Sequence, residues 1–251
     1  AKRNLVSYPV HLKLETGMNR LGFREEELDQ LFEIFQQHPY VRIMSVFSHL
    51  GTADEAANDP FTMEQIEKFK RMSSRIQEQY HYKILRHILN TAGIERFPEA
   101  SFDMVRLGIG LYGISRHIYE ELQPVSTLKS IISQIKPVRK GESVGYSRNF
   151  IAPADMTIGV IPVGYADGLR RDLGQHGICF YLNGTAAPVL GTICMDMTMI
   201  DLSSLEVNEG EEVIIFGPDH PVTELAEKLG TIPYEILAGL SERVKRVYFQ
   251  E

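Results

Sequence analysis

The sequence lacks several features that would place it in a specialised class of protein. No apolar stretch approaches the ~20 residues of a membrane span, and the first residues contain no signal-peptide core. Its two cysteines, Cys179 and Cys194, are too few for a disulfide framework, so we expect a cytoplasmic protein. A formal net charge of −7 with no cluster of Lys and Arg argues against nucleic acid or a membrane surface as the main partner.

The first part of the chain, up to about residue 115, alternates between strand and helix patterns. Residues 24–37 and 62–79 have the apolar periodicity of helices. The predicted strands are residues 10–14, 41–47, 84–89 and 102–114. Strands that alternate with helices indicate parallel βα units, and about four such units make half of an eight-stranded barrel. Half a barrel would leave strand edges and an apolar face uncovered, so we expect the chain to be a piece of something larger.

The rest of the chain has strand patterns punctuated by turn residues. Predicted strands cover residues 128–138, 157–163, 178–182, 187–199, 212–216 and 244–249, and short helices cover 222–229 and 234–240. The domain boundary is placed near residues 115–126, where Pro124 interrupts the pattern. We therefore predict an α/β domain in residues 1–120, built as the C-terminal half of a (β/α)8 TIM-type barrel, and an all-β, β-barrel-like domain in residues 121–251.

One charged residue, Arg106, stands inside the apolar run 102–114, which we expect to be a buried strand. Burying a guanidinium costs several kcal/mol unless partners are supplied, so Arg106 should face groups that accept hydrogen bonds. Gly108 and Gly110 follow it and would let backbone N–H groups approach a phosphate. An arginine that reaches solvent from the end of a strand is the alternative that the pattern leaves open.

Eight segments of the chain together resemble the successive motifs of one enzyme family. They are HLKLETGMNRLGF (11–23), SHLGTADE (48–55), RHILNTAG (86–93), FDMVRLGIGLYG (102–113), GESVGYS (141–147), IPVGYADG (161–168), GTICMDM (191–197) and TIPYE (231–235). In this order they resemble alanine racemases. The resemblance implies a pyridoxal-phosphate (PLP) βα barrel followed by a β domain, a homodimer, and the interconversion of L- and D-alanine for peptidoglycan synthesis. Residues 84–115 are especially similar to racemase domains fused behind a UDP-N-acetylmuramoyl-tripeptide–D-alanyl-D-alanine ligase.

The resemblance assigns catalysis to two bases on opposite faces of the cofactor. One is a tyrosine that matches Tyr146 and reaches the site of a partner subunit, with His49 and Arg106 as the network that assists it. The other is the lysine that forms the Schiff base to PLP, and no lysine here lies in a matching motif. The resemblance therefore implies the C-terminal part of a racemase, expected to be inactive alone.

The remaining site residues also come from matched motifs. Arg20 and the backbone of Met195 match the substrate-carboxylate positions. Lys13 matches a position that is carbamylated in many members, although an ordinary lysine paired with an acid remains open. No metal is expected. The PLP-binding positions are matched by Thr91, Arg106, Gly108, Ile109 and Tyr234.

Some departures and alternatives stay open. Thr192 lies where many members carry an arginine in the substrate access corridor, so a racemase for another small amino acid such as serine is an alternative. A PLP decarboxylase would show a different context around its cysteine, which GTICMDM does not fit. The non-enzyme alternative is a structural module that only dimerises.

Overall fold

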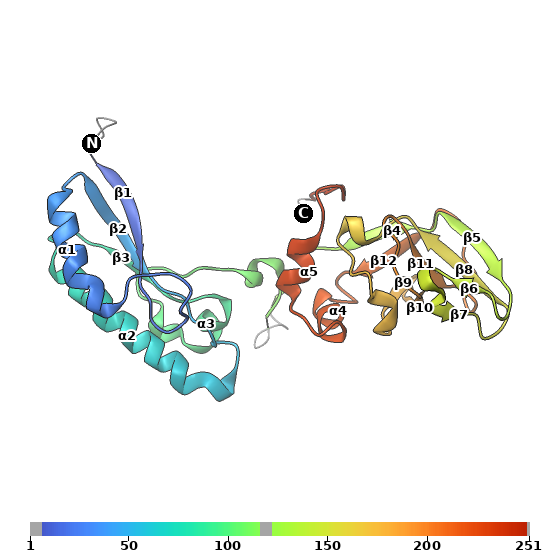
Figure 1. Ribbon diagram of the computed structural model, residues 1–251, viewed down its shortest axis with the longest axis horizontal. Coiled ribbons are helices and arrows are strands. Elements are labelled where there is room, and N and C mark those ends of the chain that lie inside the picture. The colour runs from blue at the N-terminus through green and yellow to red at the C-terminus, as the bar shows by residue number, and fades with distance from the viewer. Residues whose placement is uncertain (1–6, 116–121, 250–251) are drawn as a thin grey trace. The chain divides into compact units, whose positions relative to one another are not determined.

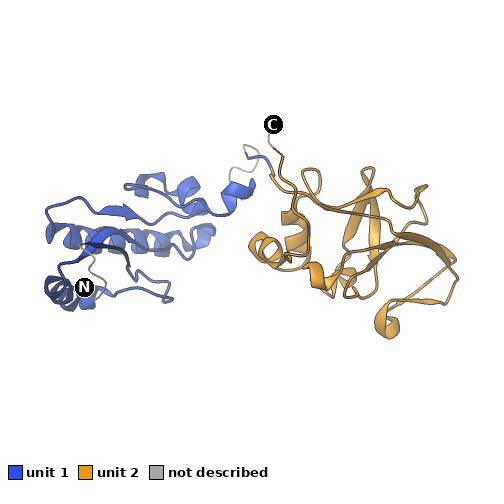
Figure 2. Ribbon diagram, turned by 90° about the horizontal axis from the view of Figure 1, so that it is seen from above, with its two compact units in different colours: residues 1–123 blue, residues 124–251 orange. Residues whose placement is uncertain are grey.

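The computed structural model describes residues 7–115 and 122–249, and the chain divides into two compact units, Ala1–Gln123 and Pro124–Glu251 (Figure 2). Each unit buries its own set of apolar side chains. We describe each unit by itself.

Unit 1 is built on a three-stranded parallel sheet in the order β1-β2-β3 (Figure 1). Its elements are β1 (Tyr8–Lys13), α1 (Leu28–Gln37), β2 (Val41–Phe47), α2 (Asp59–Glu78), β3 (Leu85–His87) and α3 (Thr91–Arg96). The buried faces of α1 and α2 share one core with apolar residues of the strands. The predicted strand 41–47 and the two predicted helices are confirmed.

Helix α2 shows how the sequence fixes these elements. It begins at Asp59, three residues before the predicted start, because Pro60 can occupy the first turn of a helix, where its missing N–H costs nothing. Ile66, Phe69 and Ile76 lie on one face and are at most 5% exposed. Phe69 also packs edge-to-face on Phe102, with ring centroids 5.2 Å apart.

The prediction of a fourth buried strand over residues 102–114 is wrong. The segment makes two backbone hydrogen bonds beside β3, from Asp103 N–H to Arg86 O and from Arg106 N–H to Leu89 O, and then forms a 3₁₀ turn over Ile109–Tyr112. Its glycines favour turns over a strand. Apolar side chains of the run are exposed, namely Met104, Val105, Leu107, Leu111 and Tyr112. The described part of unit 1 thus has three strands where four were predicted.

Unit 2 is mainly antiparallel β. A seven-stranded sheet runs in the order β4-β12-β9-β10-β11-β8-β5, and β6 and β7 form a separate pair. The strands are β4 (Leu128–Ile131), β5 (Gln134–Val138), β6 (Ser143–Val144), β7 (Phe150–Ile151), β8 (Met156–Ile161), β9 (Cys179–Leu182), β10 (Thr185–Leu190), β11 (Thr198–Asp201) and β12 (Glu212–Phe216). Helices α4 (Val222–Lys228) and α5 (Pro233–Gly239) follow. Strands β4 and β5, at opposite ends of the sheet, are joined through Ile132 and Ser133 alone, so the sheet curls until its ends meet.

Three strand predictions in unit 2 need correction. Residues 128–138 form two strands because the chain turns at Ile132 and Ser133. Residues 187–199 also divide, because Gly191 adopts a positive φ of 66° and starts a loop that ends at β11. Residues 244–249 form no strand in the described structure, and Arg246 holds this part in turns by donating to backbone oxygens of Leu240, Ser241 and Val244.

Candidate active site

The guanidinium of Arg106 is held where β2 and β3 end. Its Nη1 donates to His87 Nδ1 at 2.5 Å and to His87 O at 3.3 Å, and its Nη2 donates to Ser48 O at 2.6 Å and Ile88 O at 3.1 Å. The prediction that Arg106 faces acceptors is therefore confirmed. These bonds account for all four hydrogens on the two terminal nitrogens, and within residues 7–115 and 122–249 the Nε–H has no protein acceptor. One donor of a fixed cation is thus available to a ligand.

Basic side chains gather around Arg106. Coulombic interactions link Lys13 to Arg20 and Arg106, and link His49 to all three. Burial, followed by the nearby Arg20, lowers the pKa of Lys13 despite the opposing effect of Glu15. Burial and the same cations lower the pKa of His49 to about 4, so its imidazole is neutral at physiological pH. The cluster presents positive charge to an anion.

Glu15 holds the turn that carries Arg20. Its buried carboxylate accepts a hydrogen bond from Gly17 N–H at 2.5 Å. Burial opposes ionisation, but the backbone N–H groups of Asn19, Gly17 and Arg20, together with Lys13, outweigh it and lower the pKa of Glu15. The carboxylate therefore stays charged and fixes this turn against the end of β1.

Sequence analysis assigned no role to His87, which the structure places against Arg106. The ring stacks on Phe47 with centroids 5.2 Å apart and is 5% exposed. Burial, with help from Arg106 and His11, lowers the pKa of His87 to about 4. No local signal points to it, because its place depends on the register that pairs Lys13 with Phe47 and Phe47 with His87 and so puts all three in one row across the sheet.

Thr91 organises the glycine turn after Arg106. Its Oγ1 accepts hydrogen bonds from Gly108 N–H at 3.1 Å and Gly110 N–H at 3.2 Å. A Cβ on Gly110 would lie 3.0 Å from Thr91 Cγ2, so this close approach favours glycine. In the described part of the chain no acceptor takes the hydroxyl hydrogen of Thr91. With Ile109 in the same turn, three of the predicted phosphate-binding residues are neighbours in unit 1.

Tyr146 belongs to unit 2 and lies in a strained loop after β6. Gly145 has φ 76°, and Ser147 and Arg148, which are not glycines, have φ 60° and 52°. Two consecutive left-handed residues without glycine cost about 1–3 kcal/mol each. The side chain of Tyr146 is 60% exposed. The loop therefore holds a phenol out from the surface of unit 2 at an energetic cost.

Met195 lies in a second loop of unit 2, which accepts backbone hydrogen bonds from the 3₁₀ turn Tyr165–Asp167. Tyr165 N–H donates to Cys194 O and Ala166 N–H donates to Met195 O, at 3.1 and 3.0 Å. A Cβ on Gly164 would lie 2.3 Å from both of those oxygens, so only glycine allows this contact. The N–H of Met195 has no acceptor among the described residues. This N–H could serve a carboxylate.

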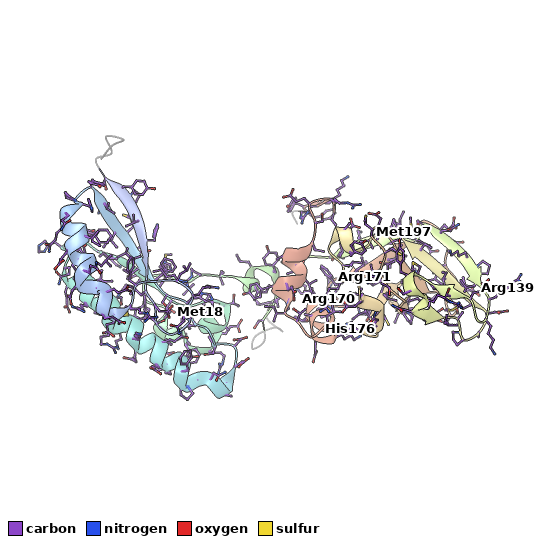
Figure 3. All side chains as sticks on the ribbon, in the orientation of Figure 1. Met18, Arg139, Arg170, Arg171, His176 and Met197 are labelled. Carbon is purple, nitrogen blue, oxygen red and sulfur yellow. The ribbon has the colours of Figure 1, made fainter. Side chains whose placement is uncertain are left out.

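The other positions noted in unit 2 have varied surroundings. Thr192 is 1% exposed and accepts a hydrogen bond from Asn149 Nδ2 at 2.7 Å. Tyr234 lies in α5 and is 48% exposed. Figure 3 labels Arg170 and His176, whose side chains both bind the Asp172 carboxylate and, with Arg170 the larger influence, lower its pKa to about 2.

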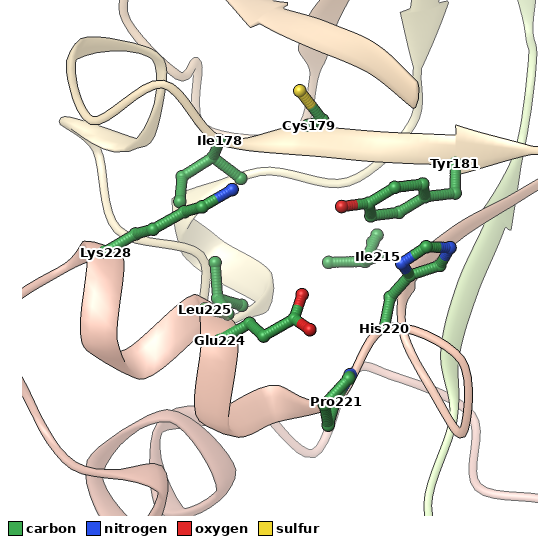
Figure 4. A pocket seen from close by; sticks show the side chains of 9 residues that line it. All are labelled: Ile178, Cys179, Tyr181, Ile215, His220, Pro221, Glu224, Leu225 and Lys228. Atoms are coloured by element: carbon green, nitrogen blue, oxygen red, sulfur yellow. The ribbon is translucent and has the colours of Figure 1, made fainter. Parts of the chain in front are cut away.

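Unit 2 also has a small cavity between β9 and α4, and none of the predicted site residues lines it (Figure 4). Cys179, Tyr181, His220, Glu224 and Lys228 are among its lining side chains, and Tyr181 stacks on His220. Its volume of about 20 Å³ holds little more than one water molecule. Within the described residues, no group of three or more His, Cys, Asp or Glu side chains is arranged to hold a metal ion.

Comparison with known proteins decides the family. The alanine racemase N-terminal domain model matches residues 1–116, and the alanine racemase C-terminal domain model matches residues 125–248. The chain is 37% identical to alanine racemase 1 of Clostridium acetobutylicum, over 100% of this chain and 67% of that protein. The chain belongs to the alanine racemase family. Members of this family are PLP-dependent isomerases that bind alanine.

Two further relatives agree. The chain is 36% identical to alanine racemase 2 of Caldanaerobacter subterraneus, over 95% of this chain and 64% of that protein. The solved alanine racemase of Streptomyces coelicolor is similar in structure, with a TM-score of 0.91 and 31% identity over 100% of this chain and 68% of that one. The chain thus spans about two thirds of the length of these alanine racemases. As for membranes, none of the helices in the described residues combines the length and apolar character of a span.

Proposed function

We propose that the chain works in the cytoplasm as the C-terminal part of a PLP-dependent alanine racemase, which supplies D-alanine for peptidoglycan synthesis. The observation that carries the proposal is the guanidinium of Arg106. Its terminal nitrogens are fully engaged by protein acceptors, and among the described residues its Nε–H has none. A fixed donor that never gives up its proton suits a ring nitrogen that accepts without being protonated. Fusion to a ligase remains a prediction.

The residues of unit 1 fit PLP. We assign Arg106 to the pyridine nitrogen and the turn of Gly108 and Ile109, with the Thr91 hydroxyl, to the phosphate. Hydroxyl and backbone N–H donors suit a dianion. The bound group supplies an electron sink for the electron pair that remains when the α-proton is removed. We also assign Tyr234 of unit 2 to the phosphate, on the match of its motif to the family.

We assign the two proton-transfer roles to Tyr146 and to a lysine outside the motifs of this chain. A free tyrosine titrates near pH 10, so Tyr146 needs nearby positive charge to accept a proton at neutral pH. The cluster of Arg20, His49 and Arg106 offers that charge. In the proposed homodimer, the Tyr146 of one copy meets the cluster of the other. His49 is neutral and can hold a hydrogen bond to the phenol without adding a proton.

Substrate orientation is assigned to Arg20 and Met195. The exposed guanidinium of Arg20 is a donor, and so is the N–H of Met195, which has no acceptor in the described part of the chain; a carboxylate requires such donors. We also propose that the neutral amine of Lys13 adds to the carbon of carbon dioxide and releases one proton to solvent, which gives a carbamate anion. The lowered pKa of Lys13 increases the fraction of neutral amine, and the nearby charges of Arg20 and Arg106 would stabilise the anion.

The proposal is tested with the chain alone and with a chimera. Purified chain mixed with PLP and L-alanine should yield no D-alanine above a blank without protein. Joined to the third of Clostridium acetobutylicum alanine racemase 1 that it does not match, the chain should racemise alanine. In that chimera Tyr146→Phe should slow proton removal from L-alanine far more than from D-alanine. A Tyr146→Phe chimera that exchanges deuterium into both enantiomers at the original rates would remove Tyr146 from the mechanism.

The same chimera and the chain alone also test the alternative functions. Turnover of L-serine that exceeds turnover of L-alanine would favour a serine racemase. A chimera that dimerises and binds PLP but racemises neither amino acid would favour the non-catalytic module. Light scattering on the chain alone at micromolar concentration tests the proposed self-association, because a monomer at 28.5 kDa contradicts it.

A further inference from the structure

A row of hydrogen bonds crosses the sheet of unit 1 and ends at Arg106. His11 in β1 and Ser45 in β2 are register partners, and their Nδ1 and Oγ atoms are 2.6 Å apart. Ser45 Oγ is 3.3 Å from Nε2 of His87 in β3, and His87 Nδ1 is 2.5 Å from Arg106 Nη1. We name these four side chains the polarised chain.

The direction of the hydrogen bonds in the polarised chain follows from the chemistry of Arg106, its last member. An arginine side chain donates hydrogen bonds and accepts none. The His87 Nδ1 that faces it must therefore be an unprotonated acceptor, and a neutral imidazole then carries its hydrogen on Nε2. That hydrogen is donated to Ser45 Oγ. The single hydrogen of the Ser45 hydroxyl is left for His11 Nδ1.

We infer that Ser45 and His11 are positioning residues for Arg106. Every donor in the polarised chain points away from the guanidinium, so each bond requires the orientation of the one before it. His87 and Ser45 are 5% and 1% exposed, and water cannot easily replace a lost partner there. Without an acceptor at Ser45, the His87 ring loses the bond that fixes its Nε2 side. Arg106 then loses the fixed ring acceptor for Nη1, which keeps only its 3.3 Å bond to His87 O, while Nη2 stays bonded to Ser48 O and Ile88 O.

The consequence concerns where the remaining donor points. With Nη1 fixed by His87 and Nη2 fixed by backbone oxygens, the Nε–H has one direction. When Nη1 keeps only the 3.3 Å bond to His87 O, the guanidinium is held more weakly on that side and can pivot about Nη2. This inference deepens the proposed function and, as far as the Nε–H of Arg106 is said to meet the cofactor, rests on it. The polarised chain itself is a property of the protein without cofactor.

The first measurement needs no variant. Long-range proton–nitrogen spectra of the nitrogen-15-labelled chain at neutral pH, without PLP, report which ring nitrogen of each histidine carries hydrogen. We expect His87 to be neutral with its hydrogen on Nε2 and an acceptor-type Nδ1. Hydrogen on His87 Nδ1, alone or together with Nε2, overturns the polarised chain.

The second measurement compares matched variants. Ser45→Ala removes a buried hydroxyl that belongs to the polarised chain. Ser73→Ala removes an equally buried hydroxyl outside it, which lies in α2 and donates to Lys70 O. The rotation rate of the Arg106 terminal nitrogens, measured by nitrogen-detected exchange, should rise about fivefold or more in Ser45→Ala. It should stay unchanged in Ser73→Ala. Equal rates in the two variants overturn the positioning role.

A further pair of variants covers the case in which Ser45→Ala does not fold. His11 is exposed, so changes there are tolerated more easily. His11→Phe keeps an aromatic ring without its nitrogens and should raise the rotation rate of the Arg106 terminal nitrogens. His11→Asn keeps an acceptor near the Nδ1 position and should leave that rate at its original value. Equal Arg106 rotation rates in His11→Phe and His11→Asn would exclude His11 from the polarised chain. These readings use no cofactor, so a chimera without racemase activity would contradict the proposed function and leave the polarised chain intact.

Discussion

Acidification should destabilise unit 1 through two neutral histidines. His49 and His87 have pKa values lowered to about 4, chiefly by burial and then by Arg106. Unfolded histidine titrates near 6.5, so between these values the unfolded chain binds more protons than the folded chain. Their stabilising effect is therefore present above about pH 6.5 and is lost as the pH falls toward 4.

The magnitude follows from the two pKa values. Between about pH 7 and pH 5, a histidine shifted from 6.5 to 4 loses on the order of 2 kcal/mol of folding free energy. His87 is 5% exposed and should approach that figure, while His49 is more open to water and should contribute less. Together they should cost roughly 3 kcal/mol, a large part of the stability of an ordinary domain. Few carboxylates titrate above pH 5, so a loss of stability between pH 7 and pH 5 reports mainly on histidine protonation.

Urea unfolding followed by far-ultraviolet circular dichroism measures the effect. The helical signal comes mostly from α1 and α2, with 10 and 20 residues, so it reports on unit 1. His87→Asn keeps an acceptor for Arg106 but cannot titrate, and His49→Asn is the matched variant at the second site. Each should lower the starting stability and reduce the loss between pH 7 and pH 5, with the larger reduction for His87→Asn. If both variants lose as much stability as the parent chain over this window, the assignment to these histidines is wrong.

Three further changes should have separable effects. Phe69→Ala should cost about 3–5 kcal/mol in urea unfolding, because Phe69 is fully buried, and a conservative Phe69→Leu should cost clearly less. Gly164→Ala should cost about 1–3 kcal/mol, because its Cβ would meet the oxygens of Cys194 and Met195, and an unchanged midpoint would contradict the contact. Thr91→Ala should weaken PLP binding about tenfold in equilibrium dialysis while Thr91→Ser keeps it, and equal losses in both would exclude the hydroxyl.

The sequence predicted those elements whose pattern is local. Helix α2 follows from apolar spacing and Pro60, and β2 and β12 have the predicted bounds because alternating or continuous apolar residues are flanked by turn signals. The run 102–114 misled because it is as apolar as a buried strand. Its glycines and the positive φ of 48° at Phe102 favour turns instead, and only two backbone bonds tie it to β3.

The candidate site could be predicted in identity but only partly in arrangement. The ordered set of matched motifs pointed to Arg106 and Thr91, and the need to satisfy a buried guanidinium predicted acceptors around Arg106. His87 and Ser45 were not found, because their role depends on the register between strands that are about forty residues apart in sequence. Register is a tertiary property, whereas periodicity only says which residues share a face.

The position of Arg106 also explains why part of this site forms where the parallel strands of unit 1 end. Parallel strands end at one edge, where the last carbonyl oxygens no longer meet a neighbouring N–H. Ser48 and Ile88, just beyond β2 and β3, present such oxygens, and the guanidinium donates to both. A charge that costs several kcal/mol to bury is thereby matched by acceptors that the sheet leaves unpaired. The geometry of Arg106 is set by two adjacent strand ends and requires no closed barrel, whereas Tyr146 is held by strain in a loop of another unit.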